Sequence, residues 1–89
     1  MAAQLISYDL KKPGQDYGKL FDAIKAIGSW WHCLESVWIV VTDKSSSVVR
    51  DELQTHVDSN DKLVVLKLSG GWASLNLPDN CNEWLKNSL

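Results

Sequence analysis

Asp9 is the residue whose type and position in this sequence best suit metal chemistry. It stands near the end of a mostly apolar run, residues 4–10, and the turn-forming residues 11–14 follow. A carboxylate at the end of a strand presents a hard oxygen ligand of the kind that Mg²⁺ binds. Mg²⁺ usually takes one or two protein carboxylates with water and phosphate, so a twofold dimer that brings two copies of Asp9 together makes a suitable site. The alternative interpretation is that Asp9 only ends the strand and caps the following loop.

Lys11 and Lys12 are the positive charges that follow Asp9 most closely in the sequence. They can meet phosphate groups drawn to a metal on Asp9, although two adjacent lysines are more often a solvated turn. The whole chain has 9 Lys and Arg against 11 Asp and Glu, a net charge of -2. This balance lacks the basic excess of a strong nucleic-acid binder. Nucleic-acid binding is therefore expected to be weak, salt-sensitive and confined to a few lysines.

Three tryptophans and a histidine lie close together, at Trp30, Trp31, His32 and Trp38. Exposed rings on a sheet would stack with the bases of a single strand, and the alternative is that they fill a core or a subunit interface. Because side chains alternate along a strand, Trp30 and Trp31 should point to opposite faces, and His32 should share a face with Trp30 and Leu34. For His32 a packed ring with one hydrogen-bonded nitrogen is favoured over an acid or base role.

Cys33 and Cys81 lie far apart in the sequence, and no second cysteine or close histidine accompanies Cys81. This spacing fits neither a disulfide framework nor a zinc site, so we expect two free thiols with a structural role. No activating base is evident beside either cysteine, which argues against a nucleophile. The sequence also has no glycine-rich phosphate loop and no Ser-His-Asp signature.

The length and composition indicate one globular domain. At 89 residues, with 45% hydrophobic and 22% charged residues, the chain is too short for two cores and too apolar to be disordered. We expect a single domain over residues 1–89, with a core at 3–68 and a C-terminal tail at 69–89. No run approaches the roughly 18 apolar residues of a membrane span, and the first residues do not resemble a signal peptide, so a cytoplasmic location is expected.

The apolar spacing predicts the short strands and helices that must position these residues. A helical stripe begins at Tyr17, with Asp16 as its N-cap, and Gly28 stops it. The alternation of elements predicts an α+β, ferredoxin-like βαββαβ sandwich, in which one antiparallel sheet has both helices on one face. The C-terminal extension carries an amphipathic stretch after Pro78 that either packs back or reaches a partner. The predicted elements are strand 4–10, helix 17–27, strands 30–34 and 37–41, helix 48–57 and strand 62–68.

Short motifs along this predicted core are similar to those of a known family. A first strand that ends in Tyr8-Asp9, a helix closed by Gly28 and a strand that opens with Ser36-Val37-Trp38 resemble the Cas-two family of CRISPR-associated spacer-acquisition proteins. The SinR-like branch is more similar still, through residues 7–10, 30–32 and 53–61. Related VapD-type ribonucleases share the plan. The chain departs from the family at residues 30–33, where tryptophans stand near the second strand in place of the usual Arg or Lys.

The resemblance implies a homodimer with Asp9 from both subunits at a cleft and Mg²⁺ as the cofactor, and Lys11 and Lys12 are the candidate nucleic-acid contacts beside it. The protein would then be a nucleic-acid-associated scaffold or a weak metal-dependent endonuclease. A dimer is also expected because helices on one face leave the other face of the sheet open, with surplus apolar surface at Trp30, Trp31, Val37 and Ile39. Two alternatives stay open: a non-enzymatic dimeric module that recognises a protein or small ligand, and a toxin-type ribonuclease.

Overall fold

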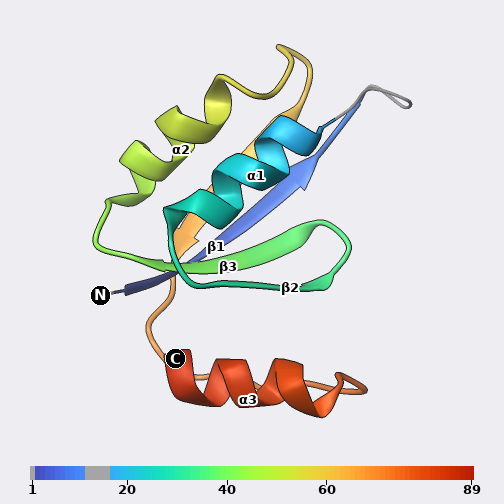
Figure 1. Ribbon diagram of the computed structural model, residues 1–89, viewed down its shortest axis with the longest axis vertical. Coiled ribbons are helices and arrows are strands. Elements are labelled where there is room, and N and C mark those ends of the chain that lie inside the picture. Colours follow the sequence, from blue (N-terminus) through green and yellow to red (C-terminus); the bar gives the residue numbers. More distant parts are fainter. Residues whose placement is uncertain (1, 12–16) are drawn as a thin grey trace.

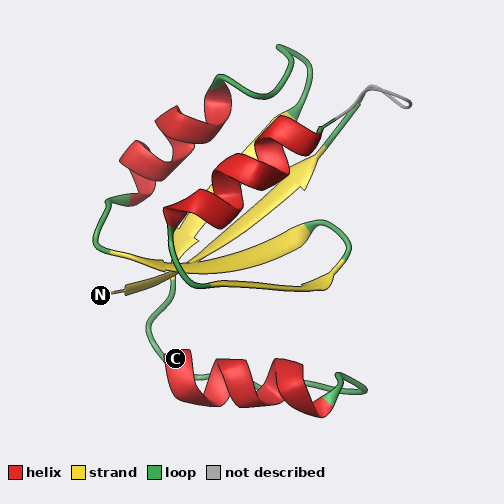
Figure 2. Ribbon diagram, in the orientation of Figure 1, coloured by secondary structure: helices red, strands yellow, loops and turns green. Residues whose placement is uncertain are grey.

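The chain folds into an antiparallel sheet with three helices, and the computed structural model describes residues 2–11 and 17–89 (Figures 1 and 2). The predicted order of strands and helices is confirmed, and the amphipathic stretch after Pro78 forms a third helix. In chain order the elements are β1 (Ala2–Asp9), α1 (Gly18–Ile27), β2 (Trp30–Leu34), β3 (Val37–Thr42), α2 (Ser46–Gln54), β4 (Lys62–Lys67) and α3 (Asp79–Ser88). Within the described ranges, none of the helices is long and apolar enough to cross a membrane.

The four strands lie in the order β2-β3-β1-β4, and every neighbouring pair is antiparallel. The predicted α+β class with one antiparallel sheet is therefore confirmed. The register sets Leu5 of β1 opposite Ile39 of β3 on one side and opposite Leu66 of β4 on the other. Because side chains alternate along each strand, these three residues point to the same face of the sheet.

Helices α1 and α2 cover one face of the sheet, as Figure 1 shows. Each helix contributes two fully buried residues four positions apart, the spacing of one helical stripe. The hydroxyl of Ser45 caps α2 by accepting a hydrogen bond from the Val48 N–H at 3.2 Å. The predicted N-cap of α1, Asp16, lies outside the described residues. The core under these helices consists of Ile6, Tyr17, Leu20, Ile24, Trp38, Val40, Val49 and Leu53.

Gly28 ends α1, as predicted, and its role is steric. A Cβ atom at this position would collide with the carbonyl oxygen of Val41. The adjacent Ser29 carbonyl accepts a hydrogen bond from the Val41 N–H at 2.9 Å, which holds the two backbones together. A residue without a side chain is therefore required where the chain leaves α1 and enters β2.

Helix α3 packs on the opposite face of the sheet, so the C-terminal extension folds back onto the domain. Its buried residues Cys81 and Leu85 join Ala3, Trp31 and Ile39 in a second apolar cluster. The indole Nε1–H of Trp31 donates a hydrogen bond to the Cys81 carbonyl at 3.1 Å. Part of the apolar surface that predicted a dimer is thus covered within the chain.

The expectation of two free thiols is wrong, because Cys33 of β2 and Cys81 of α3 form a disulfide. Their Cα atoms are 6.4 Å apart, within the range that a disulfide spans. Spacing rules detect closely spaced cysteine motifs, whereas this pair comes from distant elements that meet only in the folded chain.

The prediction that Leu34 shares a face with His32 is also wrong. An irregularity in β2 after Trp31 places Leu34 on the face of Trp31 instead.

Candidate functional site

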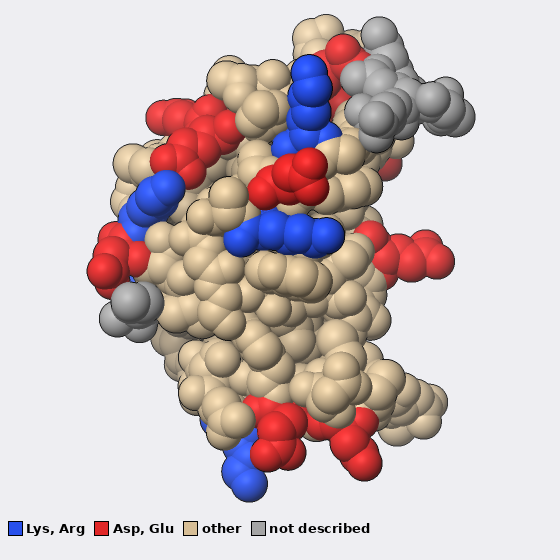
Figure 3. Space-filling model, in the orientation of Figure 1, with Lys and Arg blue, Asp and Glu red and all other residues tan. Residues whose placement is uncertain are grey.

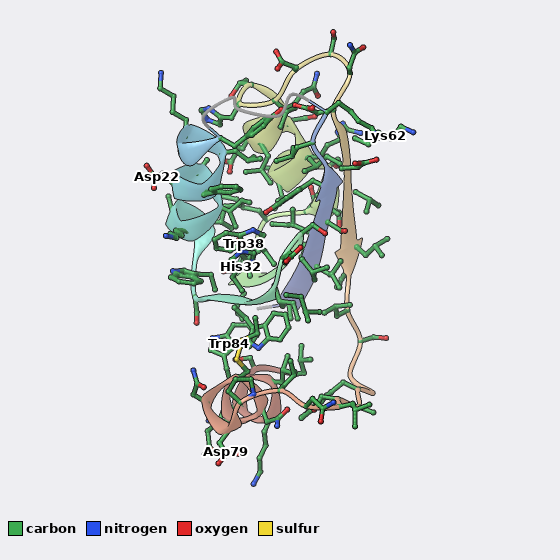
Figure 4. All side chains as sticks on the ribbon, turned by 90° about the vertical axis from the view of Figure 1, so that its right-hand side faces the viewer. Asp22, His32, Trp38, Lys62, Asp79 and Trp84 are labelled. Atoms are coloured by element: carbon green, nitrogen blue, oxygen red, sulfur yellow. A yellow bond between two sulfur atoms is a disulfide. The ribbon has the colours of Figure 1, made fainter. Side chains whose placement is uncertain are left out.

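Asp9 is the last residue of β1 and lies at the surface. It stands opposite Lys62 of β4, at the end of the sheet where Figure 4 labels Lys62. Its Oδ2 is 2.8 Å from the Nζ of Lys11, and 57% of the Asp9 side chain is exposed. Such an exposed ion pair contributes only about 0–1 kcal/mol. A competing cation could therefore displace the Lys11 ammonium from Asp9 at little cost.

One protomer alone does not fit a magnesium ion. In residues 2–11 and 17–89, no group of three or more His, Cys, Asp or Glu side chains is placed to hold a metal. Asp9 supplies one carboxylate, which forms an ion pair with the cation Lys11. The other predicted nucleic-acid contact, Lys12, lies outside the described residues. Metal binding at Asp9 thus needs a second source of oxygen ligands, as the sequence already indicated.

Asp61, in the turn before β4, holds the loop beside Asp9, a role that no local sequence pattern indicates. Its carboxylate accepts hydrogen bonds from the backbone N–H of Lys11 at 2.7 Å, the hydroxyl of Tyr17 at 3.0 Å and the N–H of Asp58 at 2.8 Å. Asp61 therefore connects the chain after β1, the start of α1 and the end of the α2–β4 turn. It positions the backbone of Lys11, whose side chain pairs with Asp9.

The sheet face that carries Asp9 is also apolar and partly uncovered. Alternation places Leu5, Ser7 and Asp9 of β1 on this face, together with Lys62, Val64 and Leu66 of β4. We call these six residues the open face. Val64 is 46% exposed and Leu66 is 51% exposed, whereas α1 and α2 lie on the other side of the sheet (Figure 4).

A row of four apolar side chains crosses all four strands on this same side. The register pairs Trp31 with Ile39, Ile39 with Leu5, and Leu5 with Leu66. We call this set the apolar row. Trp31 and Ile39 are buried in the cluster that includes α3, whereas Leu66 at the other end is exposed. The C-terminal helix therefore covers one half of the row and leaves the other half open.

The predicted aromatic platform is mostly internal. The ring of His32 stacks on Trp38 with centroids 3.8 Å apart, and its Nδ1 is 3.0 Å from the Val37 carbonyl oxygen. One nitrogen of His32 thus has a partner, as predicted, but the side chain is exposed and lies against Trp38 at the surface (Figure 4). Trp38 is 2% exposed and Trp31 is 5% exposed. Of the three clustered tryptophans, only Trp30 therefore keeps a large exposed surface.

Tyr8 lies beside this cluster, and the fold perturbs the ionisation of its phenol. Burial raises the pKa of the Tyr8 phenol, and the hydrogen bond from Trp38 lowers it to a smaller extent. The Nε1–H of Trp38 donates that hydrogen bond to the Tyr8 oxygen at 3.0 Å. Tyr8 points to the face of α1 and α2, so it does not join Asp9 on the open face.

The charged side chains give no strong indication of a polyanion site. On the face that Figure 3 shows, positive and negative groups of the described residues are interspersed rather than separated by sign. An example is α1, where Lys19, Asp22 and Lys25 follow one another at intervals of one turn or less. Weak, local nucleic-acid binding, as expected from the net charge, stays a prediction.

No protein-family model matches the chain. The likeness to the Cas-two family therefore remains a prediction that rests on the short motifs around Asp9, Gly28 and Trp38.

Proposed function

We propose that the protein is a homodimeric, Cas-two-like nucleic-acid-associated protein with a ferredoxin-like fold, in which two protomers pair through the open face. The observation that carries the proposal is that Asp9 shares this face with the exposed Val64 and Leu66. A twofold axis repeats the same patch on both partners, and an axis that runs along β1 or passes near its end would bring the two Asp9 residues toward each other.

The exposed apolar residues of the open face supply only part of the free energy that a dimer needs. Full burial of a Val or Leu side chain stabilises by roughly 1.5–3 kcal/mol, so covering the exposed halves of Val64 and Leu66 on two protomers contributes about 4 kcal/mol. Association also costs translational and rotational freedom. We therefore expect a dimer that depends on protein concentration rather than a permanent one.

The chemistry of the paired site follows from its charges. Two Asp9 carboxylates at one interface repel each other, and Mg²⁺ held between them would remove that repulsion and stabilise charge on a phosphodiester. Each Asp9 must first release Lys11, which costs little because the pair is exposed. Lys11 is then free to meet a backbone phosphate. In the scaffold form of the proposal, Lys11 binds the nucleic-acid backbone in the same way and no cleavage follows.

A non-enzymatic dimeric module is the second candidate, and the ion pair between Asp9 and Lys11 favours it. With Asp9 neutralised in this way, the open face could recognise another apolar surface without any metal. A toxin-type ribonuclease, the third interpretation, differs in that its expression should slow growth.

Light scattering tests the dimer. Relative to the wild-type protein, Val64→Asp should shift the equilibrium from dimer toward monomer, because the substitution places a charge in the interface. The matched control is Val48→Asp on α2, since Val48 is 44% exposed but lies outside the open face. Wild-type protein that stays monomeric at high micromolar concentration would contradict the proposal.

Asp9→Asn tests the metal site in the same preparation. The substitution keeps the shape of the side chain but removes the anionic ligand, so Mg²⁺-dependent cleavage of RNA or DNA should disappear while the dimer persists. Assays with Mg²⁺, with Mn²⁺ and with a chelator are compared for both proteins. Equal cleavage rates would remove the catalytic role of Asp9. Absence of cleavage in the wild type, with nucleic-acid binding retained, would select the scaffold form.

A further inference from the structure

The Cys33–Cys81 disulfide is the covalent tie between α3 and the sheet. Helix α3 follows β4 after the irregular residues 68–78, which have no strand or helix of their own. Figure 1 shows α3 set apart from α1 and α2, at the other end of the molecule. With the sheet intact, the disulfide closes a short loop that leaves the end of β4, runs through residues 68–80 to Cys81, and returns to the sheet at Cys33 of β2.

The noncovalent contacts of α3 are modest. Besides the hydrogen bond from Trp31, the Nε1–H of Trp84 donates to the Ser29 hydroxyl at 3.2 Å in an exposed position. The buried apolar residues of the helix are Cys81 and Leu85, and the partly buried Trp84 and the C-terminal Leu89 pack against the same cluster. A ten-residue helix is also below the length at which isolated helices are stable in water, roughly 12–15 residues. Helix α3 therefore depends strongly on its tether.

The segment before α3 does not close tightly on the sheet. A cavity of about 380 Å³ lies between the sheet residues Leu5 and Ile39 and the segment residues Trp72 and Leu77. Leu75 in the same segment is 84% exposed. Loose packing of this kind gives little dispersion energy to hold the segment in place.

The main core does not depend on α3. The buried residues under α1 and α2 and those under α3 form two separate clusters on opposite faces of the sheet. The sheet and the first two helices can therefore persist when α3 leaves. Departure of α3 would expose Trp31 and Ile39, and the whole apolar row would then be open from β2 to β4.

We propose that the Cys33–Cys81 bond is a reducible latch that keeps α3 over the apolar row, and that its reduction frees this surface for a second copy of the chain. The second copy is the occupant because the freed half of the row continues directly into the open face at Leu5 and Leu66. This inference rests on the proposed homodimer.

The chemistry is thiol–disulfide exchange with a dithiol reductant. A thiolate of the reductant attacks the sulfur of Cys33, which is only half-buried, and Cys81 leaves as a thiolate that takes up a proton. The second thiol of the reductant then displaces Cys33 from the mixed disulfide. Two electrons and two protons pass to the protein, and the reductant becomes a disulfide.

Hydrogen exchange of the full chain, oxidised and then reduced with dithiothreitol, tests the latch. We expect amide protection in α3 to fall roughly a hundredfold on reduction, the effect that the chain-entropy model gives for releasing a loop of about 15 residues. Protection in β1 and β3 should remain. Cys81→Ser should reproduce the reduced state without any reductant and should no longer respond to dithiothreitol.

Light scattering on the same samples separates the latch from the dimer. Release of α3 with a shift to the dimer at lower concentration is the expected result. Unchanged protection of α3 in both reduced wild type and Cys81→Ser would overturn the latch, whatever the mass. Release of α3 with the same dimerisation constant in both states would overturn the coupling while leaving the homodimer intact. A monomer in every state would overturn the homodimer and the coupling together.

Discussion

Replacing Asp61 with alanine should destabilise the fold by about 3 kcal/mol, because three donors lose a charged acceptor. A hydrogen bond to a charged group contributes roughly 1.5–3 kcal/mol when its donor is shielded from water. The Tyr17 hydroxyl and the Asp58 N–H are partly buried, whereas the Lys11 N–H is exposed and can turn to water. The hydrogen bonds from the Tyr17 hydroxyl and the Asp58 N–H, each at the lower value of 1.5 kcal/mol, together give about 3 kcal/mol. For a domain of this size it lowers the melting temperature by about 15 °C.

Thermal unfolding followed by circular dichroism measures this effect. The matched control is Asp51→Ala, which removes an exposed carboxylate paired with Arg50 and should change stability by less than about 0.5 kcal/mol. Tyr17→Phe removes one donor alone and should cost about 1 kcal/mol. In the double variant with Asp61→Ala the two losses should not add, because they share one hydrogen bond. A melting temperature of Asp61→Ala within a few degrees of wild type would refute the assignment of Asp61 as the anchor of this loop.

Two further predictions concern backbone packing and alkaline stability. Gly28→Ala should lower the free energy of unfolding, measured in urea, by about 1–3 kcal/mol, because the added Cβ meets the Val41 carbonyl. Gly71→Ala should leave it nearly unchanged, because a Cβ there meets no atom within 4 Å. Equal stabilities of the two variants would contradict the steric role of Gly28. Because the folded pKa of Tyr8 is raised, stability should be constant below about pH 10, the pKa of the unfolded phenol, and should fall as the pH rises through the folded value. Tyr8→Phe should lose less stability over that range, and an alkaline loss as steep as that of wild type would exclude Tyr8 as its source.

The elements could be predicted because their signals are local. Leu20 and Ile24 recur at the helical period and Gly28 follows them, so α1 is specified within one short stretch. The paired strands β2 and β3 were equally clear from their aromatic and β-branched residues. Helix α2 ends at Gln54 rather than at residue 57, since the amphipathic pattern continues beyond the last helical hydrogen bonds.

The site was only partly accessible because its contacts are long-range. Asp9 could be singled out from its place at a strand end, but the carboxylate of Asp61 meets Lys11 across 50 residues of sequence. The disulfide joins cysteines 48 residues apart, and neither cysteine belongs to a closely spaced motif from which a pairing could be predicted. The position of Leu34 depends on an irregularity in β2, which pairs Leu34 with Val37 and so places it on the face of Trp31. In each case the contact depends on how distant strands and helices are placed by the folded sheet, which no short stretch of sequence specifies.

The strand order also bears on aggregation. Because β4 lies at an edge of the sheet, its outer backbone groups could pair with another chain, and such edge pairing can continue without limit into a fibre. Lys62 and Lys67 stand at the two ends of β4, on opposite faces, and place a positive charge at each end of the edge. Charged residues at an edge oppose stacking of identical strands. The two lysines therefore oppose open-ended growth of a fibre through the β4 edge.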